Sequence, residues 1–96
     1  MATARAKMLI DRLPAQPSAA SLSAIITKLK AGPCKVKIDG SLVARLDPGC
    51  LEALLVIAQT QRARGDAFRL EAPSDAFLEE IARFGVPTDL LKGPTP

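Results

Sequence analysis

The chain has 96 residues, of which 48% are hydrophobic and 24% charged, a composition typical of one globular domain over 1–96. Thirteen Lys and Arg against 10 Asp and Glu give a net charge of +3, and the chain contains no His, no Trp, no Tyr and three Phe. This composition excludes imidazole catalysis and His ligation, leaves almost no base-stacking side chains, and provides too few Cys for a four-thiolate zinc site.

Flexible ends are expected at 1–7 and 93–96. Between them, the first half of the chain predicts a strand, a helix and a second strand. A short strand is expected over 8–13, and a helix follows, capped by Ser18 or Ser21 and stopped by Gly32. Residues 34–39 alternate apolar and polar side chains, which is the pattern of a strand with one buried face.

The second half predicts a long helix, a short strand and a last helix. Asp47 is a natural N-cap before Pro48, and the long helix ends near Arg64 and Gly65. A strand over 68–71 precedes a helix capped by Ser74 or Asp75, with four side chains expected to face inward: Phe77, Leu78, Ile81 and Phe84. The order predicts an α/β fold with a small mixed sheet, and helices packed mainly on one face.

The long helix carries more apolar surface than one core stripe requires. At about 100° per residue, one side gathers a stripe that we expect to face the core, made of Leu51, Leu54, Leu55 and Ala58. Ala53, Val56 and Thr60 then point the opposite way, with Ile57 and Cys50 on the flank. We expect this second side to contribute to a partner-binding face; the alternative is that a neighbouring helix buries Ile57 and Val56.

Three consecutive segments resemble the STAS domain, the fold of bacterial anti-sigma-factor antagonists. They are Val36–Gly40, Ala44–Asp47 and Pro48–Leu55, and the downstream order of Arg-Gly at 64–65, strand and last helix is also similar to that family. The resemblance covers roughly residues 22–91 and implies a STAS-like fold. It also implies that the loop at Asp47 and the helix after it contact a regulatory protein.

The loop departs from the family at the residues that carry its regulation. Where partner-switching members hold a phosphorylated Ser or Thr, this chain has Pro48 and Gly49, and Cys50 stands at the family's Gly position. The resemblance therefore implies that the usual phosphorylation switch is absent at this loop. Ser41, one loop earlier, is a surface turn serine in the simpler interpretation.

Two uses of such a domain follow from the resemblance. One is a signalling protein that binds an anti-sigma factor or a histidine-kinase-type protein, for example beside chemotaxis genes; the other is the STAS subunit that stabilises the ATPase of a bacterial ABC lipid transporter. We expect no enzyme activity, catalytic residue, cofactor, metal, nucleic-acid partner or membrane insertion, and a cytoplasmic location. The expected partner-binding residues are Asp47, Pro48, Gly49, Cys50, Ala53, Val56, Ile57 and Thr60.

Two further features have simple alternatives. Cys50 lies near a helix N-terminus, where its thiol could be reactive, but a buried small hydrophobe is the alternative. Lys35, Lys37 and Arg69 fall on the polar side of their strands, where they form either a basic patch or an ordinary solvated face.

Overall fold

Strands alternate with helices in the computed structural model, which describes residues 7–87 and Leu91. The elements are β1 (Lys7–Arg12), the 3-10 helix η1 (Ala19–Leu22), α1 (Ser23–Ala31), β2 (Cys34–Asp39), α2 (Pro48–Arg64), β3 (Phe68–Glu71) and α3 (Asp75–Arg83). The predicted flexible ends lie outside the described residues, except Lys7, which begins β1.

The three strands form one sheet in the order β1-β2-β3, and both pairs are parallel. The α/β class is confirmed, but the described strands are all parallel, whereas a mixed sheet was predicted. The reason lies in the connections: α1 and α2 each return the chain to the same end of the sheet, and a helical crossover of this kind joins parallel strands.

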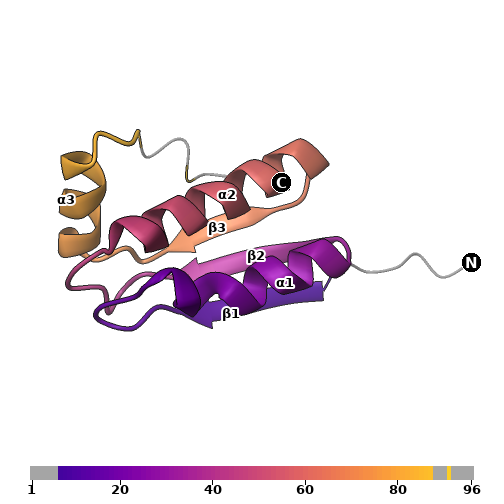
Figure 1. The fold of residues 1–96 in the computed structure, drawn as a ribbon, viewed down its shortest axis with the longest axis horizontal. Coiled ribbons are helices and arrows are strands. Elements are labelled where there is room, and N and C mark those ends of the chain that lie inside the picture. Colours follow the sequence, from indigo (N-terminus) through magenta and orange to yellow (C-terminus); the bar gives the residue numbers. More distant parts are fainter. Residues whose placement is uncertain (1–6, 88–90, 92–96) are drawn as a thin grey trace, which may run out of the picture.

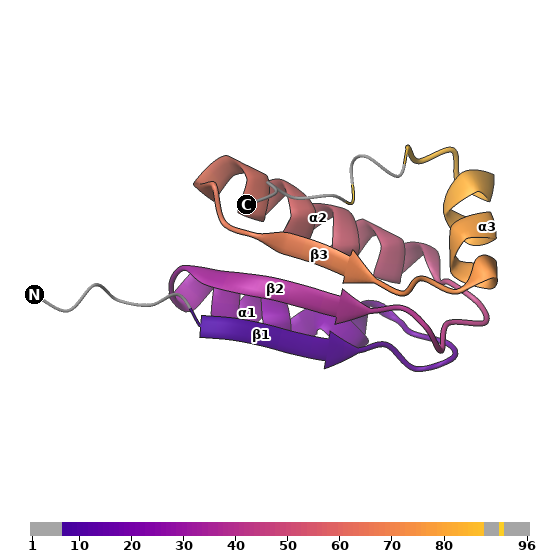
Figure 2. The ribbon, with the colours of Figure 1, turned by 180° about the vertical axis from the view of Figure 1, so that it is seen from behind.

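Helices cover one face of this sheet. α1 and α2 lie side by side over the strands (Figure 1), and the view from behind shows the other face with no helix across it (Figure 2). The alternation in β2 follows from this arrangement: Cys34, Val36 and Ile38 are buried, while Lys35 is exposed. The prediction that helices pack mainly on one face is confirmed.

The C-terminal half of α2 is fastened to its neighbours by two side chains. The amide Nε2 of Gln61, a fully buried side chain, donates to the carbonyl oxygens of Cys34 at 2.6 Å and Ala67 at 3.0 Å. The guanidinium of Arg64 donates to the carbonyl of Leu29 at 2.7 Å. Because these carbonyls belong to β2, the β3 approach and α1, the contacts fix α2 along the sheet.

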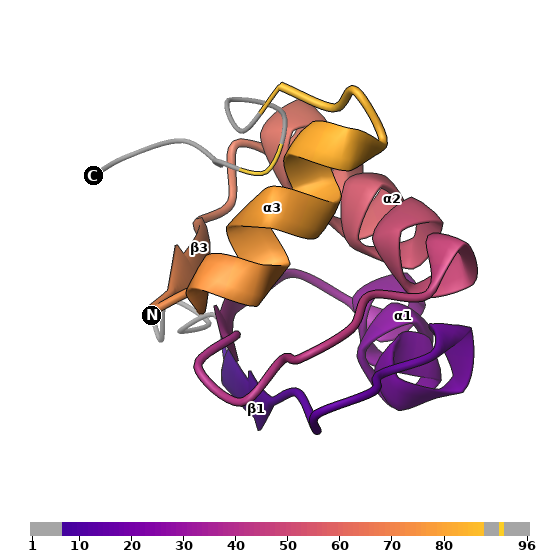
Figure 3. The ribbon, with the colours of Figure 1, turned by 90° about the vertical axis from the view of Figure 1, so that its left-hand side faces the viewer.

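α3 sits across the end of the sheet and not on its face (Figure 3). Ser74 caps it by accepting a hydrogen bond from the amide of Phe77 at 3.0 Å. Phe77 and Ile81 are fully buried, as predicted, whereas Leu78 and Phe84 are 39% and 40% exposed. The prediction that these two residues face inward is therefore wrong, because α3 meets the body along only one narrow side.

Candidate functional site

The loop that leads into α2 is shaped by three adjacent residues. The Asp47 carboxylate accepts a hydrogen bond from the amide of Gly49 at 2.9 Å, so Asp47 is the N-cap that the sequence predicted. Pro48 occupies the first turn, where its missing N–H leaves no bond unmade. A Cβ built at Gly49 would lie 2.8 Å from Asp47 Oδ2, so a larger residue here would have to shift the capping carboxylate. The loop is therefore held in one shape by the cap.

The loop also rests on the segment that follows β1. The amides of Ala44 and Arg45 both donate to the carbonyl of Ala15, at 2.8 and 3.1 Å. A surface pocket of about 330 Å³ opens beside this junction, lined by Gln16, Pro17, Ser18, Arg45, Leu46, Asp47 and Pro48. The start of α2 thus borders a hollow that could accept a side chain from another protein.

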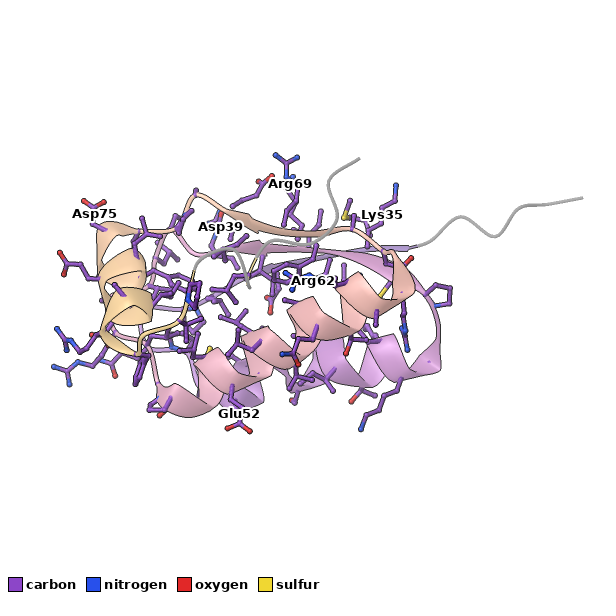
Figure 4. The ribbon with its side chains drawn as sticks, turned by 90° about the horizontal axis from the view of Figure 1, so that it is seen from above. Lys35, Asp39, Glu52, Arg62, Arg69 and Asp75 are labelled. Atoms are coloured by element: carbon purple, nitrogen blue, oxygen red, sulfur yellow. The ribbon has the colours of Figure 1, made fainter. Side chains whose placement is uncertain are left out.

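The outward side of α2 continues from this loop. We define the α2 outer face as Asp47, Pro48, Gly49, Glu52, Val56 and Gln59. Val56 is 45% exposed, Glu52 and Gln59 are exposed, and Thr60 is half-buried at the border. Figure 4 shows Glu52 projecting from α2 away from the sheet, while Lys35 and Arg69 project from the opposite side of the molecule.

Besides Thr60 at its border, three residues of the predicted partner-binding set lie outside the α2 outer face because they are buried. Cys50 and Ile57 are fully buried and Ala53 is 8% exposed, so the expectation that they would offer contact area is wrong. With about 100° per residue, the buried side of α2 is centred near Gln61, which is about 70° from the direction predicted from its leucines. The difference arises because η1 packs against the flank of α2 and the sheet lies beneath it. Val56 is exposed in either case, because its direction lies between the solvent side of α2 predicted from the leucines and the solvent side observed in the structure.

Glu52 and Gln59 are the surface residues that the prediction missed. The predicted outer face lies opposite the leucine stripe, whereas these two polar residues lie beside that stripe in sequence and are absent from the predicted partner-binding set. Their polarity was the better signal, because charged and amide side chains mark the solvent side of a helix more directly than leucines mark the core side. Gln61 would have misled the same argument, since it is polar and fully buried.

The thiol of Cys50 is poorly suited to react. Burial, with a smaller contribution from the Asp47 carboxylate, raises the pKa of Cys50 to about 11. Burial also raises the pKa of Cys34, and both thiols are free. The interpretation of Cys50 as a buried small hydrophobe is therefore confirmed, and the reactive alternative is wrong.

Ion pairs cross the open face of the sheet. Arg12 lies 3.4 Å from Asp39, and Lys37 and Arg69 lie 3.3 and 3.7 Å from the same Glu71 carboxylate. Paired charges of this kind belong to a solvated strand face more than to a basic patch.

Within residues 7–87 and Leu91, no group of three or more Cys, Asp or Glu could hold a metal ion, and no helix has the length and hydropathy to cross a membrane.

Comparison with protein families gives a match over most of the chain. Residues 15–92 match the family described as "Mlab, STAS domain". The chain belongs to the STAS domain family. Comparison with curated proteins and with solved structures found no match. The parallel sheet with α1 and α2 on one face is consistent with a STAS domain, and the resemblance drawn from the loop and the following helix is confirmed.

Membership of the STAS family makes the α2 outer face a candidate surface for protein binding. STAS domains are generally non-enzymatic modules that commonly bind other proteins, and a regulatory or binding role suits this one. Pro48, which is exposed, and Gly49, which is half-buried, begin α2 at the positions where, by the family resemblance, phosphorylated members carry hydroxyl groups. Neither residue has an oxygen that could accept a phosphoryl group.

Proposed function

We propose that this STAS domain is a non-enzymatic regulatory protein of the bacterial cytoplasm that binds a signalling protein through its α2 outer face. The partner would be an anti-sigma factor or a histidine-kinase-type protein, including one that serves chemotaxis. The observation that carries the proposal is Val56, an apolar side chain 45% exposed in the middle of the helix that follows the family's contact loop. Two free, buried thiols agree with a reducing compartment.

The chemistry of the α2 outer face indicates what kind of surface fits it. Val56 supplies an apolar centre, Gln59 supplies an amide, and Asp47 and Glu52 place two exposed carboxylates at its N-terminal end. A complementary partner has a small apolar recess with basic residues beside it, because opposite charges across a rim steer association. The pocket at Arg45 and Pro48 extends the same surface. An area this small implies a modest or transient complex.

We further propose that phosphorylation of this loop does not regulate the contact. The Asp47 cap and the close approach at Gly49 give the loop its shape without any modification. Incubation with ATP and the kinase-type partner should leave the intact mass of the domain unchanged. A gain of one phosphate would contradict this part of the proposal, and mapping to Ser41 would place the switch one loop earlier.

A second candidate function follows from the same loop. A loop held by its own cap, with no hydroxyl to modify, suits a permanent subunit contact as well as a regulated one. In that case the domain would be the STAS subunit that stabilises the ATPase of a bacterial ABC lipid transporter. Stable co-purification with the ATPase, and a loss of ATPase stability without the domain, would favour this candidate over a signalling role.

The experiment that tests the proposal compares two variants on opposite faces. Each candidate partner encoded near this gene is purified and titrated with the domain by calorimetry. The candidates are an anti-sigma factor, a histidine-kinase-type protein and an ABC ATPase. Val56→Glu should weaken the productive complex at least about tenfold, which corresponds to about 1.4 kcal/mol. Ile10→Glu, at a residue 71% exposed on the open sheet face, should bind like the wild type. Equal affinity of the wild type, Val56→Glu and Ile10→Glu for the partner would refute the α2 outer face as the contact.

A further inference from the structure

β1 is a free edge of the sheet. It pairs with β2 alone, and within residues 7–87 no strand lies along its other side. The amide of Leu13, just after the strand, donates to the carbonyl of Asp39 in β2 at 3.0 Å. Because backbone groups alternate in direction along a strand, the N–H and C=O groups of Met8, Ile10 and Arg12 point away from β2. The edge therefore offers a row of unpaired donors and acceptors.

The most exposed side chains in the middle of this edge are apolar, although Arg12 at its end is charged. Met8 is 51% exposed and Ile10 is 71% exposed, and both lie on the open face of the sheet. The opposite edge, β3, has only four residues, and its exposed Arg69 and half-buried Glu71 form an ion pair. Short strands with charged side chains are a common way to prevent edge pairing, and long edges with exposed apolar side chains invite it. β1 is thus the edge that favours another strand.

We propose that the strand is β1 of a second copy of this chain, running antiparallel about a two-fold axis at Leu9. In this register Leu9 lies opposite Leu9, and Met8 of each copy lies opposite Ile10 of the other. Cross-strand pairs of apolar residues stabilise antiparallel ladders. The pairing joins two three-stranded sheets into one continuous sheet.

The neighbouring register is less favourable. Moving the axis to Ile10 keeps Ile10 opposite Ile10, but it sets Leu9 opposite Asp11 and Met8 opposite Arg12, so an apolar residue meets a charged one in both of these pairs. Arg12 is also committed to Asp39, at 3.4 Å. A one-residue slip is excluded more strongly, because it would direct the free backbone groups of one copy to the engaged groups of the other. Of the registers centred on Leu9 and Ile10, the sequence of β1 therefore favours the one centred on Leu9.

Dimerisation at this edge is independent of the proposed function. The open face and the α2 outer face lie on opposite sides of the molecule (Figures 2 and 4), so each copy keeps its α2 outer face accessible. A contact confined to one strand is smaller than the interfaces of stable dimers, so we expect a low-affinity dimer that forms as concentration rises.

Sedimentation equilibrium between about 10 µM and about 1 mM tests the proposal, since small interfaces associate in this range. The wild type should shift from monomer towards dimer. Ile10→Pro removes an outward N–H without touching the β2 ladder and should stay monomeric, as should Ile10→Lys, which keeps the N–H but adds a charge. Far-UV circular dichroism establishes that both variants fold. Val56→Glu, on the other face, should dimerise like the wild type.

Oxidative cross-linking tests the register. A mixture of Met8→Cys and Ile10→Cys proteins should form the mixed disulfide dimer in excess over either like-with-like dimer, while native Cys34 and Cys50 are buried and do not contribute. A wild type that stays monomeric throughout the range would overturn the proposal. A dimer that persists in folded Ile10→Pro and folded Ile10→Lys would also overturn it. Preferential disulfide formation between two Ile10→Cys chains would overturn the register.

Discussion

Gly40 is the position where one added methyl group should disturb the fold most. A Cβ built there would lie 2.5 Å from Cδ2 and 2.7 Å from Cε2 of Phe77, well inside a carbon contact of roughly 3.5–4.0 Å. Phe77 is fully buried and has little room to move. The amide of Gly40 donates to Glu71 and its carbonyl accepts from Ser74 and Val43, so the backbone is also held. Gly40→Ala must therefore displace α3 or strain the end of β2.

The expected loss follows from the cost of overpacking a filled core, about 1–3 kcal/mol. A chain of this length has a free energy of unfolding of roughly 5–14 kcal/mol at about 0.05–0.15 kcal/mol per residue. The melting temperature of such a domain falls by about 4–8 °C per kcal/mol, so Gly40→Ala should lower it by roughly 4–24 °C. Thermal and urea unfolding followed by circular dichroism measure the loss.

Two comparisons isolate the contact with Phe77. Gly32→Ala is the matched control, because no heavy atom of the described residues lies within 4 Å of a Cβ built there, and its effect should stay within about 0.5 kcal/mol. In a Phe77→Leu background, Gly40→Ala should cost less than in the wild type, because the ring edge that it meets is gone. An unchanged melting temperature, or an equal loss in both backgrounds, would refute the reasoning.

Three further predictions concern the loop and its ionisable groups. Asp47→Ala should destabilise the protein by about 1 kcal/mol in urea unfolding, because the amide of Gly49 loses its cap. Neither Cys34 nor Cys50 should react with a thiol reagent at pH 8 until the protein is unfolded. Because burial raises the pKa of Cys50 to about 11, the free energy of unfolding should fall as the pH rises from 9 towards 11. Hydrogen bonds from Ser41, with a smaller contribution from Arg12, lower the pKa of Asp39, so its contribution to stability is present at neutral pH and should be lost as the pH falls below about 4.

Each of these predictions has a matched variant. Asp47→Asn keeps an N-cap oxygen and should recover most of the stability lost in Asp47→Ala. Cys50→Ala should flatten the alkaline decline, and a rapid native reaction of one thiol would show that its burial is incomplete. Asp39→Asn should flatten the acid decline; an acid profile identical to that of the wild type would assign the decline to other carboxylates.

The elements that depend on local signals were predictable from the sequence. Asp47 before Pro48, and Gly65 at the other end, set the bounds of α2, since caps act through the residues next to them. The alternation in β2 likewise follows from neighbours in the chain. The family resemblance at the Asp47 loop depended on the same local order.

The direction in which each helix faces was not predictable from one helix alone. α2 turned its Ile57 and Cys50 sides inward because η1, distant in sequence, packs against its flank. α3 left Leu78 exposed because it crosses the end of the sheet, an arrangement that depends on Gly40 admitting the ring of Phe77. Such orientations follow from tertiary contacts, which hydrophobic periodicity within a helix does not record.

The most direct test of the central claim is to locate the contact surface on the domain. Amide NMR spectra of the isotope-labelled protein are recorded with increasing amounts of the partner identified by calorimetry. We expect the largest amide shifts on the α2 outer face, at Asp47, Gly49, Glu52, Val56 and Gln59, with the amides of the three strands unchanged. Shifts concentrated on Lys35, Lys37 and Arg69, with the α2 outer face unchanged, would contradict it.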